Sequence, residues 1–263
     1  MRTFALHFVA VAVAVTASQA SAQTHIYTLN GTLTDQNNAS SLVAHGGALN
    51  GGGGYDFGLN QGLSLANVFN QGKYANGVYA IFIRAAFANV QNPGTNGGQS
   101  KVIDYNDRTN DKGLYVVPGL GASGDVELIA SSNHQSLISN QTQNNVFAVY
   151  TVTRDVAGLM HFFINGTYLA DMTFVDAAGD ARFSAPGAIA QFFRDDVSPG
   201  SDDANFGSVN YISIYDHALG IEDVAVFASR IPPEIVAPEP ASMVLLATGL
   251  VGVFGAVRRR SKA

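Results

Sequence analysis

The stretch that decides the fold is "AVYTVTRDVAGLMHFFINGTYLADMTF", Ala148 to Phe174. It consists of β-branched and aromatic runs of about six to eight residues, separated at short intervals by turn residues. Asp155 to Gly158 forms one turn. Asn165 and Gly166 form the next, because both tolerate the positive φ of a type I′ hairpin. The stretch therefore predicts successive strands joined by tight turns.

The same pattern extends over the body of the chain. No stretch before Ile221 sustains a helical period, and many short strands with Gly-rich punctuation indicate a sandwich or barrel. "GGALNGGGG", Gly46 to Gly54, is too poor in side chains to pack, so it predicts a flexible surface loop or tight turns. Further strands are expected at Ile26–Leu29, Val78–Ala88, Lys101–Tyr105, Gly113–Val117, Val126–Ser131 and Val209–Tyr215.

The run from Val78 to Ala88 is apolar on both of its faces. One face carries Tyr79, Ile81 and Ile83, and the other carries Ala80 and Phe82. A strand with this pattern is covered on both sides, so we expect it at the centre of a sheet.

Both ends of the chain are apolar. Arg2, an apolar stretch from Phe4 to Val15 and the small residues up to Ala22 predict a cleaved secretory signal over residues 1–22. Residues 241–257 carry no charge and, at about 1.5 Å per residue, are just long enough to span a bilayer as a helix. The basic residues after them belong on the cytoplasmic side. This predicts a single transmembrane helix followed by a basic cytoplasmic stub over residues 241–263, and an exported body.

Charge and cysteine content exclude some functions. Without Arg2 and the four cations of the tail, the chain has 9 basic and 20 acidic residues, a net charge of about −11. This balance argues against binding nucleic acid, whose phosphates require a basic surface. Cysteine is absent, so neither disulfides nor thiolate metal sites contribute. We therefore expect the body to be stabilised by its core.

The C-terminal end resembles a known sorting signal. A Pro-Glu-Pro motif, a short apolar helix and a terminal arginine cluster are similar to the PEP-CTERM signal of Gram-negative bacteria. The resemblance implies that an exosortase-type membrane peptidase processes the tail, so that an inner-membrane-anchored precursor becomes a cell-surface or extracellular protein. A plain single-span anchor is the alternative. The residues that carry the signal are Pro238, Glu239, Pro240, Arg258, Arg259 and Arg260.

The body resembles a second family. "FGSVNYISIYDHALGIEDVAVF", Phe206 to Phe227, is similar to the closing strand and short helix of laminin-G-like, concanavalin A-like domains. "YTLNGTLTDQNNASSLVAHGGAL" and "FFINGTYLADM" resemble the first strand and the central hairpin of that group. The resemblance implies an all-β, two-sheet antiparallel jelly-roll sandwich over residues 23–229, followed by a linker over 230–240. It also implies carbohydrate or protein ligands and, in some members, calcium.

An acidic loop is the candidate metal site. Asp195, Asp196 and Asp203, with Asp202 beside them, lie in a short loop that contains Gly, Pro and Ser. Carboxylate oxygens that converge from one loop are what Ca²⁺ requires. The alternative is a solvated loop whose carboxylates cap backbone N–H groups. A second group, which includes Asp104, Asp107 and Arg108, is interpreted as a structural ion-pair and turn network.

Catalytic patterns are missing from the sequence. Retaining glucanases place paired glutamates on one strand face, whereas this chain has four glutamates with no two close together on a strand. The six histidines show no metal-ligand spacing, and His161 is interpreted as a packing residue. We therefore expect a non-enzymatic protein. Possible sugar-stacking rings, each equally compatible with ordinary packing, are Tyr55, Tyr74, Tyr105 and Tyr168.

Three hypotheses for the function follow. The first is an exported cell-surface or extracellular-matrix protein whose sandwich binds a polysaccharide or another surface component. The second is a structural or adhesive matrix protein without a small ligand. The third, disfavoured by the few glutamates, is a glycoside hydrolase.

Overall fold

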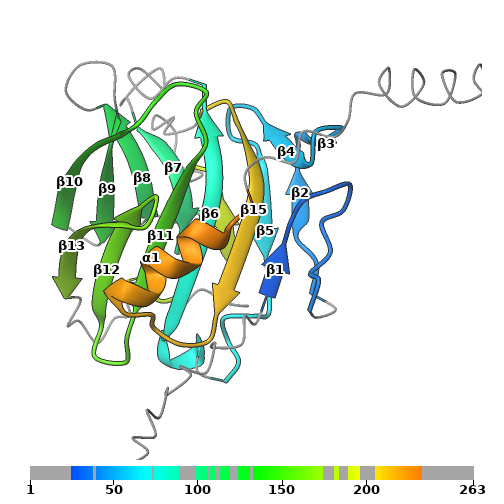
Figure 1. Ribbon diagram of the computed structural model, residues 1–263. Helices are drawn as coiled ribbons and strands as arrows, with labels where there is room; N and C mark the ends of the chain where they lie inside the picture. The colour runs from blue at the N-terminus through cyan, green and yellow to red at the C-terminus, as the bar shows by residue number, and fades with distance from the viewer. Residues whose placement is uncertain are drawn as a thin grey trace, which may run out of the picture.

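The protein is a sandwich of two antiparallel β-sheets (Figure 1). The computed structural model describes residues 25–37, 40–72, 74–88, 99–105, 107–109, 113–118, 124–130, 133–173, 181–183, 189–195 and 205–232. The eight-stranded sheet has the order β13 (Thr167–Thr173), β12 (Leu159–Ile164), β11 (Ala148–Arg154), β6 (Tyr79–Phe87), β15 (Gly207–Tyr215), β4 (Gly54–Phe57) and β3 (Ala48–Asn50), and β1 (His25–Tyr27) also pairs with β15. The seven-stranded sheet has the order β10 (Asn133–Thr142), β9 (Gly124–Ala130), β8 (Gly113–Pro118), β7 (Ser100–Asp104), β14 (Ala190–Phe192), β5 (Gly62–Leu65) and β2 (Val43–His45).

The core lies between the two sheets because alternate residues of each strand point inward. On β6 the inward set includes Tyr79, Ile81 and Ile83, each with no exposed surface. Leu63 and Phe192 meet them from the seven-stranded sheet. The predicted two-sheet sandwich is therefore confirmed, and β6 occupies the centre of its sheet as its two apolar faces require.

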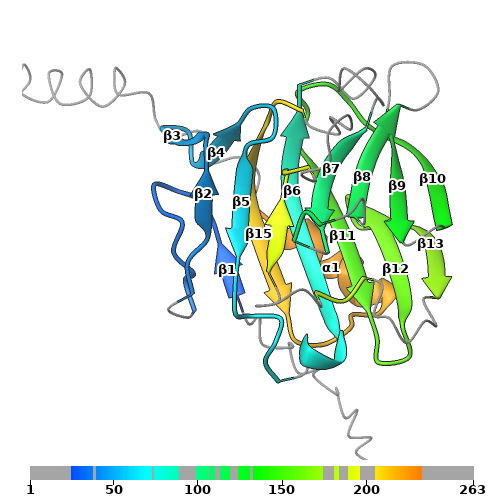
Figure 2. The same cartoon turned by 180° about the vertical axis from the view of Figure 1, so that it is seen from behind.

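The outer face of the eight-stranded sheet is covered by the helix α1 (Ile221–Arg230). Figure 1 shows α1 lying across this face, and the view from behind in Figure 2 places the seven-stranded sheet in front of it. Val224 of α1 packs on Phe82 of β6 and Tyr215 of β15 in a second apolar cluster. The predicted short C-terminal helix is thus confirmed, and it covers the second apolar face of β6.

Local turn predictions are largely confirmed. Asn165 and Gly166 both have positive φ, 51° and 77°, and join β12 to β13 as a tight hairpin. The expectation of a loop or turns over residues 46–54 is correct for the turn at residues 51–53 and wrong for β3, which pairs with β4. β3 forms although its surroundings are rich in glycine, because the hydrogen bonds between paired strands come from the backbone and do not depend on side chains. In this pairing Ala48 lies opposite Asp56.

The two chain ends were predicted to contain the signal peptide, the linker and the transmembrane helix. Residues 1–24 and 233–263 lie outside the described residues, which places the sorting-signal residues outside them as well. Within the described ranges, no helix has the length and apolar character needed to cross a membrane.

Candidate functional site

A row of polar side chains crosses the outer face of the seven-stranded sheet. Ser64 of β5 lies directly opposite Gln191 of β14, which in turn lies opposite Asp104 of β7. Their neighbours Leu63 and Phe192 belong to the core, so alternation turns Ser64 and Gln191 outward. In β7, a register shift between Lys101 and Ile103 precedes Asp104. Strand register thus brings together three polar side chains from distant parts of the sequence.

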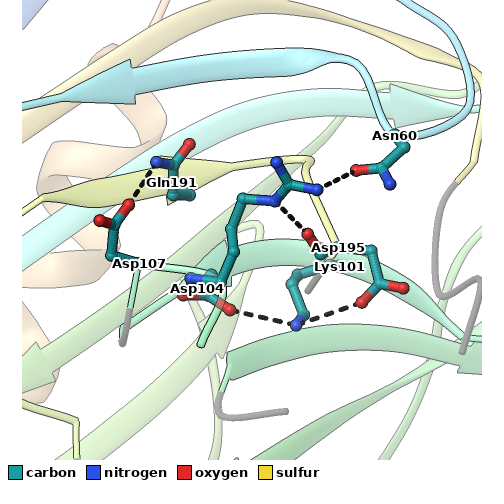
Figure 3. A network of polar contacts seen from close by, with 7 residues as sticks. Asn60, Lys101, Asp104, Asp107, Gln191 and Asp195 are labelled. Carbon is teal, nitrogen blue, oxygen red and sulfur yellow. Dashed lines mark hydrogen bonds and ion pairs between the residues drawn. The ribbon is translucent and has the colours of Figure 1, made fainter. Parts of the chain in front are cut away.

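A buried ion-pair group lies at one end of this row. The Lys101 ammonium is 3.1 Å from a carboxylate oxygen of Asp104 and 3.3 Å from one of Asp195. None of the three side chains has exposed surface, and Figure 3 shows Lys101 lying between the two carboxylates. A buried carboxylate requires a charged or hydrogen-bonding partner, so Lys101 fixes the segments that carry Asp104 and Asp195 to one another.

Arg108 extends this group toward the solvent. Its backbone N–H donates to Asp104 at 2.9 Å, and its guanidinium donates to the carbonyl of Asp195 and, at 3.1 Å, to the side chain of Asn60. Asp107 and Arg108 have φ values of 50° and 63°. For arginine this left-handed conformation costs about 1–2 kcal/mol, so the surrounding hydrogen bonds hold a strained turn that aims Arg108 across the sheet.

The residues around Arg108 are connected through Gln191, which is itself buried, whereas Asp107, Arg108 and Arg194 are half-exposed. Gln191 donates to Asp107 at 2.7 Å and accepts from Arg194 at 2.9 Å. The side chain of Arg194 passes close to Gly62, where an added Cβ would lie 3.0 Å from Cγ of Arg194 and 2.1 Å from the carbonyl oxygen of Phe192. We call this surface the polar patch and define it as His45, Asn60, Asp107, Arg108, Gln191 and Arg194.

The electrostatics of the polar patch are set by its two arginines. Burial lowers the pKa of Arg194, and the charge of Arg108 lowers it further. His45, whose Nε2 lies 2.8 Å from the hydroxyl of Ser64, has a pKa below 6.5 because of partial burial and the charges of Arg194 and Arg108. The charged form of the imidazole is therefore disfavoured beside the two guanidinium groups.

The predicted calcium residues have different outcomes. Asp195 is fully buried and pairs with Lys101. Asp196 and Asp203, as well as Asp202, lie outside the described residues, so their convergence with Asp195 stays a prediction. Among the described residues, no group of three or more histidine, aspartate or glutamate side chains is arranged to hold a metal ion. Asp104 accepts from the backbone N–H of Arg108 and Asp107 accepts from Gln191, which agrees with the turn-network part of the interpretation of this group; its other members lie outside the described residues.

For three of the four candidate tyrosines the structure supports ordinary packing, one of the two alternatives that the sequence left open. Tyr55, Tyr74 and Tyr105 are buried core residues, and Tyr168 is 37% exposed on the other sheet. An aromatic ring that the sequence reasoning missed, Phe206, is 55% exposed and packs against the turn that begins at Gly58 and carries Asn60. Phe206 directly precedes β15, and its exposure could not be predicted because the aromatic and β-branched residues of this stretch were interpreted as core residues of a strand.

The polar patch and the ion-pair group together contain equal numbers of formal charges of each sign, three cations and three carboxylates. Amide, carboxylate and guanidinium groups are planar and can bind two atoms of a partner at once. Their mixture offers donors and acceptors without a net charge. This chemistry matches the hydroxyl groups of a neutral sugar, each of which both donates and accepts.

The C-terminal segment identifies the class of the protein. Residues 236–260 match the family described as the PEP-CTERM protein-sorting motif. The chain therefore carries a PEP-CTERM sorting motif, which marks an exported, surface-sorted protein and implies processing by an exosortase. No curated protein sequence matches the chain.

Solved structures of other proteins share the fold of this chain. The botulinum neurotoxin serotype D binding domain has a TM-score of 0.56 and 12% identity, over 79% of this chain and 51% of that one. A structure of botulinum neurotoxin type C, whose title ties cell entry to interaction with two ganglioside molecules, has a TM-score of 0.56 and 13% identity, over 81% and 52%. Domain 4 of the extracellular arabinanase AbnA from Geobacillus stearothermophilus, in complex with arabinotriose, has a TM-score of 0.52 and 16% identity, over 79% and 98%.

These similarities concern the fold. This chain spans about half the length of the neurotoxin binding domains and nearly the whole arabinanase domain. The sequences are too different for the binding residues of either protein to be transferred to this one.

Proposed function

We propose that the protein is a non-enzymatic, exported surface protein whose sandwich binds a neutral glycan at the polar patch. The observation that carries this proposal is the connected set of planar hydrogen-bonding side chains that a buried ion-pair group holds in place. A preorganised set of this kind binds without first losing side-chain freedom, which would otherwise reduce the affinity.

Two further observations support a sugar ligand. Phe206 places an exposed ring against the turn that carries Asn60, so an apolar sugar face has a surface to stack on near the polar groups. The same fold occurs in a botulinum neurotoxin that interacts with gangliosides and in an arabinanase domain in complex with arabinotriose. This similarity of fold is an analogy, and it favours carbohydrate over other classes of ligand.

The chemistry of the polar patch favours binding over hydrolysis. Glycosidases use two carboxyl groups that both reach the substrate, about 5–10 Å apart. Asp104 and Asp195 are fully buried on Lys101 and cannot contact a glycan, which leaves Asp107 as the half-exposed carboxylate of the described site. One accessible carboxylate does not supply both an acid and a nucleophile or base.

The exported protein, recovered from the producing cells, tests this proposal on an array of neutral and acidic polysaccharides. We expect retention on at least one neutral glycan. The variants Asn60→Ala and Arg194→Ala should each weaken it about tenfold or more, while Tyr168→Ala on the other sheet should leave it unchanged. Absence of binding to every glycan would favour the adhesive alternative, and release of reducing ends would favour the hydrolase.

Calcium binding by Asp195, Asp196 and Asp203 is a separate proposal. Lys101 already supplies positive charge to Asp195, so calcium must either share this carboxylate or displace the ammonium group. If the site exists, saturating calcium at about 100 times the Kd stabilises the fold by roughly 2.7 kcal/mol. A melting temperature that is identical in chelator and in excess calcium would remove the metal site and leave the polar patch unaffected.

A further inference from the structure

A pocket of about 220 Å³ lies on the opposite face of the sandwich from the polar patch. It opens between the C-terminal end of α1 and the strands β6 and β15, on the face that Figure 1 shows toward the viewer. Its lining includes Phe82, Tyr211, Ser213, Tyr215, Phe227 and Arg230. The volume is below the roughly 300–1,000 Å³ of pockets for drug-sized ligands, so the pocket suits one small ring.

Three aromatic rings form a rigid wall of this pocket. The ring of Tyr215 lies 5.6 Å from that of Phe82 and 5.2 Å from that of Phe227, measured between centroids. Phe82 and Tyr215 are almost fully buried, which fixes their rings, while Phe227 is half-buried. Aromatic faces carry partial negative charge and attract the C–H groups of an apolar sugar face.

Polar groups stand at the edge of the wall. Tyr211 is half-buried, Arg230 is exposed, and the Arg230 guanidinium lies 5.9 Å from the centroid of Phe227. The hydroxyl groups of Tyr211, Ser213 and Tyr215 can donate and accept, whereas Arg230 donates only. A ring that carries several hydroxyl groups matches this mixture of donors and acceptors.

The surrounding charge disfavours an anionic ligand. Arg230 lies in the last turn of α1, where the partial negative charge of the helix C-terminus partly offsets its positive charge. The exported body also has a net charge of about −11. A carboxylated sugar would therefore gain little from Arg230, and a neutral sugar would lose nothing.

We propose that this pocket is a second carbohydrate site, which takes a single neutral sugar ring with its apolar face against Phe227, the half-buried ring of the aromatic wall. The site is independent of the polar patch. Because the two sites lie on opposite faces of the sandwich, one molecule can hold two glycan chains at once. The protein would then cross-link polysaccharide at the cell surface, a role that neither site performs alone.

Saturation-transfer NMR on the full protein tests the pocket, with the methyl glycosides of glucose, galactose and arabinose as neutral probes and glucuronate as the acidic one. We expect at least one neutral glycoside to show transfer to its C–H protons and to bind about tenfold more weakly to Tyr211→Ala and to Arg230→Ala. Both positions have accessible side chains, and thermal melts verify that these variants fold. Tyr168→Ala, which lies in neither site, serves as the control and should keep the full signal. Arg194→Ala removes binding at the polar patch, so the signal that this variant retains belongs to the pocket.

The outcomes separate the pocket from the polar patch. If Arg194→Ala abolishes all sugar binding and Tyr211→Ala changes nothing, the pocket is not a sugar site and the polar patch stands. If glucuronate binds more tightly than the neutral glycosides, the charge argument is wrong. Transfer that is absent for every neutral glycoside would also overturn the proposal. If both sites bind, the wild type should precipitate a neutral polysaccharide, and either Arg194→Ala or Tyr211→Ala should prevent precipitation while leaving binding to the other site.

Discussion

The two outer faces of the sandwich are covered by different chemistry on the same kind of sheet. On the eight-stranded sheet, Phe82 and Tyr215 point outward and α1 packs on them. On the seven-stranded sheet, Gln191 and Asp104 point outward and are held by hydrogen bonds and ion pairs. Backbone pairing is antiparallel in both sheets, so it does not explain the difference. The outward-facing residues of each strand therefore determine whether a helix or a polar network covers the face.

The two faces should also differ in what destabilises them. Truncating an apolar side chain under α1 leaves a cavity, and the loss in stability depends on the volume of that cavity. Removing one member of the ion-pair group changes the balance of buried charge, which costs more stability than a cavity does. The predictions that follow are arranged from the largest expected effect to the smallest.

Replacing the buried ammonium should have the largest effect. Lys101→Met removes the ammonium group from between the buried carboxylates of Asp104 and Asp195, so we expect a loss of about 3–5 kcal/mol in the free energy of unfolding. Denaturant unfolding measures it. The double variant Lys101→Met/Asp195→Asn should recover part of the loss, because one buried charge is removed. A loss below about 1 kcal/mol in the single variant would mean that the ion pairs do not hold this face together.

The helix-covered face should respond more mildly. Val224→Ala removes two methyl groups from beneath α1 and should cost roughly 1–3 kcal/mol. Val226→Ala on the same helix is the matched control, because Val226 is 47% exposed and its loss should stay within about 0.5 kcal/mol. Equal losses for the two valines would show that α1 does not pack through the face described here.

Strain in the turn that carries Arg108 can be isolated by comparing two variants. Both Arg108→Gly and Arg108→Ala remove the guanidinium, but only glycine accepts a φ of 63° without cost. We expect the glycine variant to be the more stable of the two by roughly 1 kcal/mol. If the alanine variant proves equally stable, the left-handed turn is not strained in solution.

A change of pH should have the smallest effect. The pKa of His45 is below 6.5 in the folded state, so the unfolded chain binds this proton at a higher pH than the folded one. Stability should therefore fall slightly as the pH is lowered from above 6.5 through the folded pKa, and His45→Gln should remove that part of the slope. Melting curves of the two proteins between pH 7.5 and 5.5 provide the comparison, and identical slopes would contradict it.

Sequence reasoning predicted the architecture through patterns that are local. The two apolar faces of residues 78–88 predicted a doubly covered central strand, the Asn165-Gly166 pair predicted a hairpin, and the residues after Ile221 predicted a helix. Each of these depends on neighbours within a few positions. The strand β3 was missed because its Gly-rich surroundings contain few side chains, although backbone pairing requires none.

The candidate sites were harder to predict because they depend on contacts between distant residues. The register that places Ser64, Gln191 and Asp104 in one row joins three strands, and the partner of Asp195 is Lys101. The sequence predicted Asp195 as a calcium ligand because other aspartates lie near it in the chain. In the structure Asp195 forms an ion pair with Lys101 of β7. The aromatic wall of the pocket was missed because Tyr215 and Phe227 meet only when α1 folds back over β15.

The central claim is that the polar patch binds a neutral glycan through groups that the buried ion pairs hold in place. Isothermal titration of the exported protein with the best neutral glycan from the array tests it most directly, with Asn60→Ala/Arg194→Ala as the binding variant and Tyr168→Ala as the control. The account predicts saturable binding that the double variant loses by about a hundredfold, roughly 2.7 kcal/mol, while the control retains it. A double variant that folds normally and binds as tightly as the wild type would contradict the account.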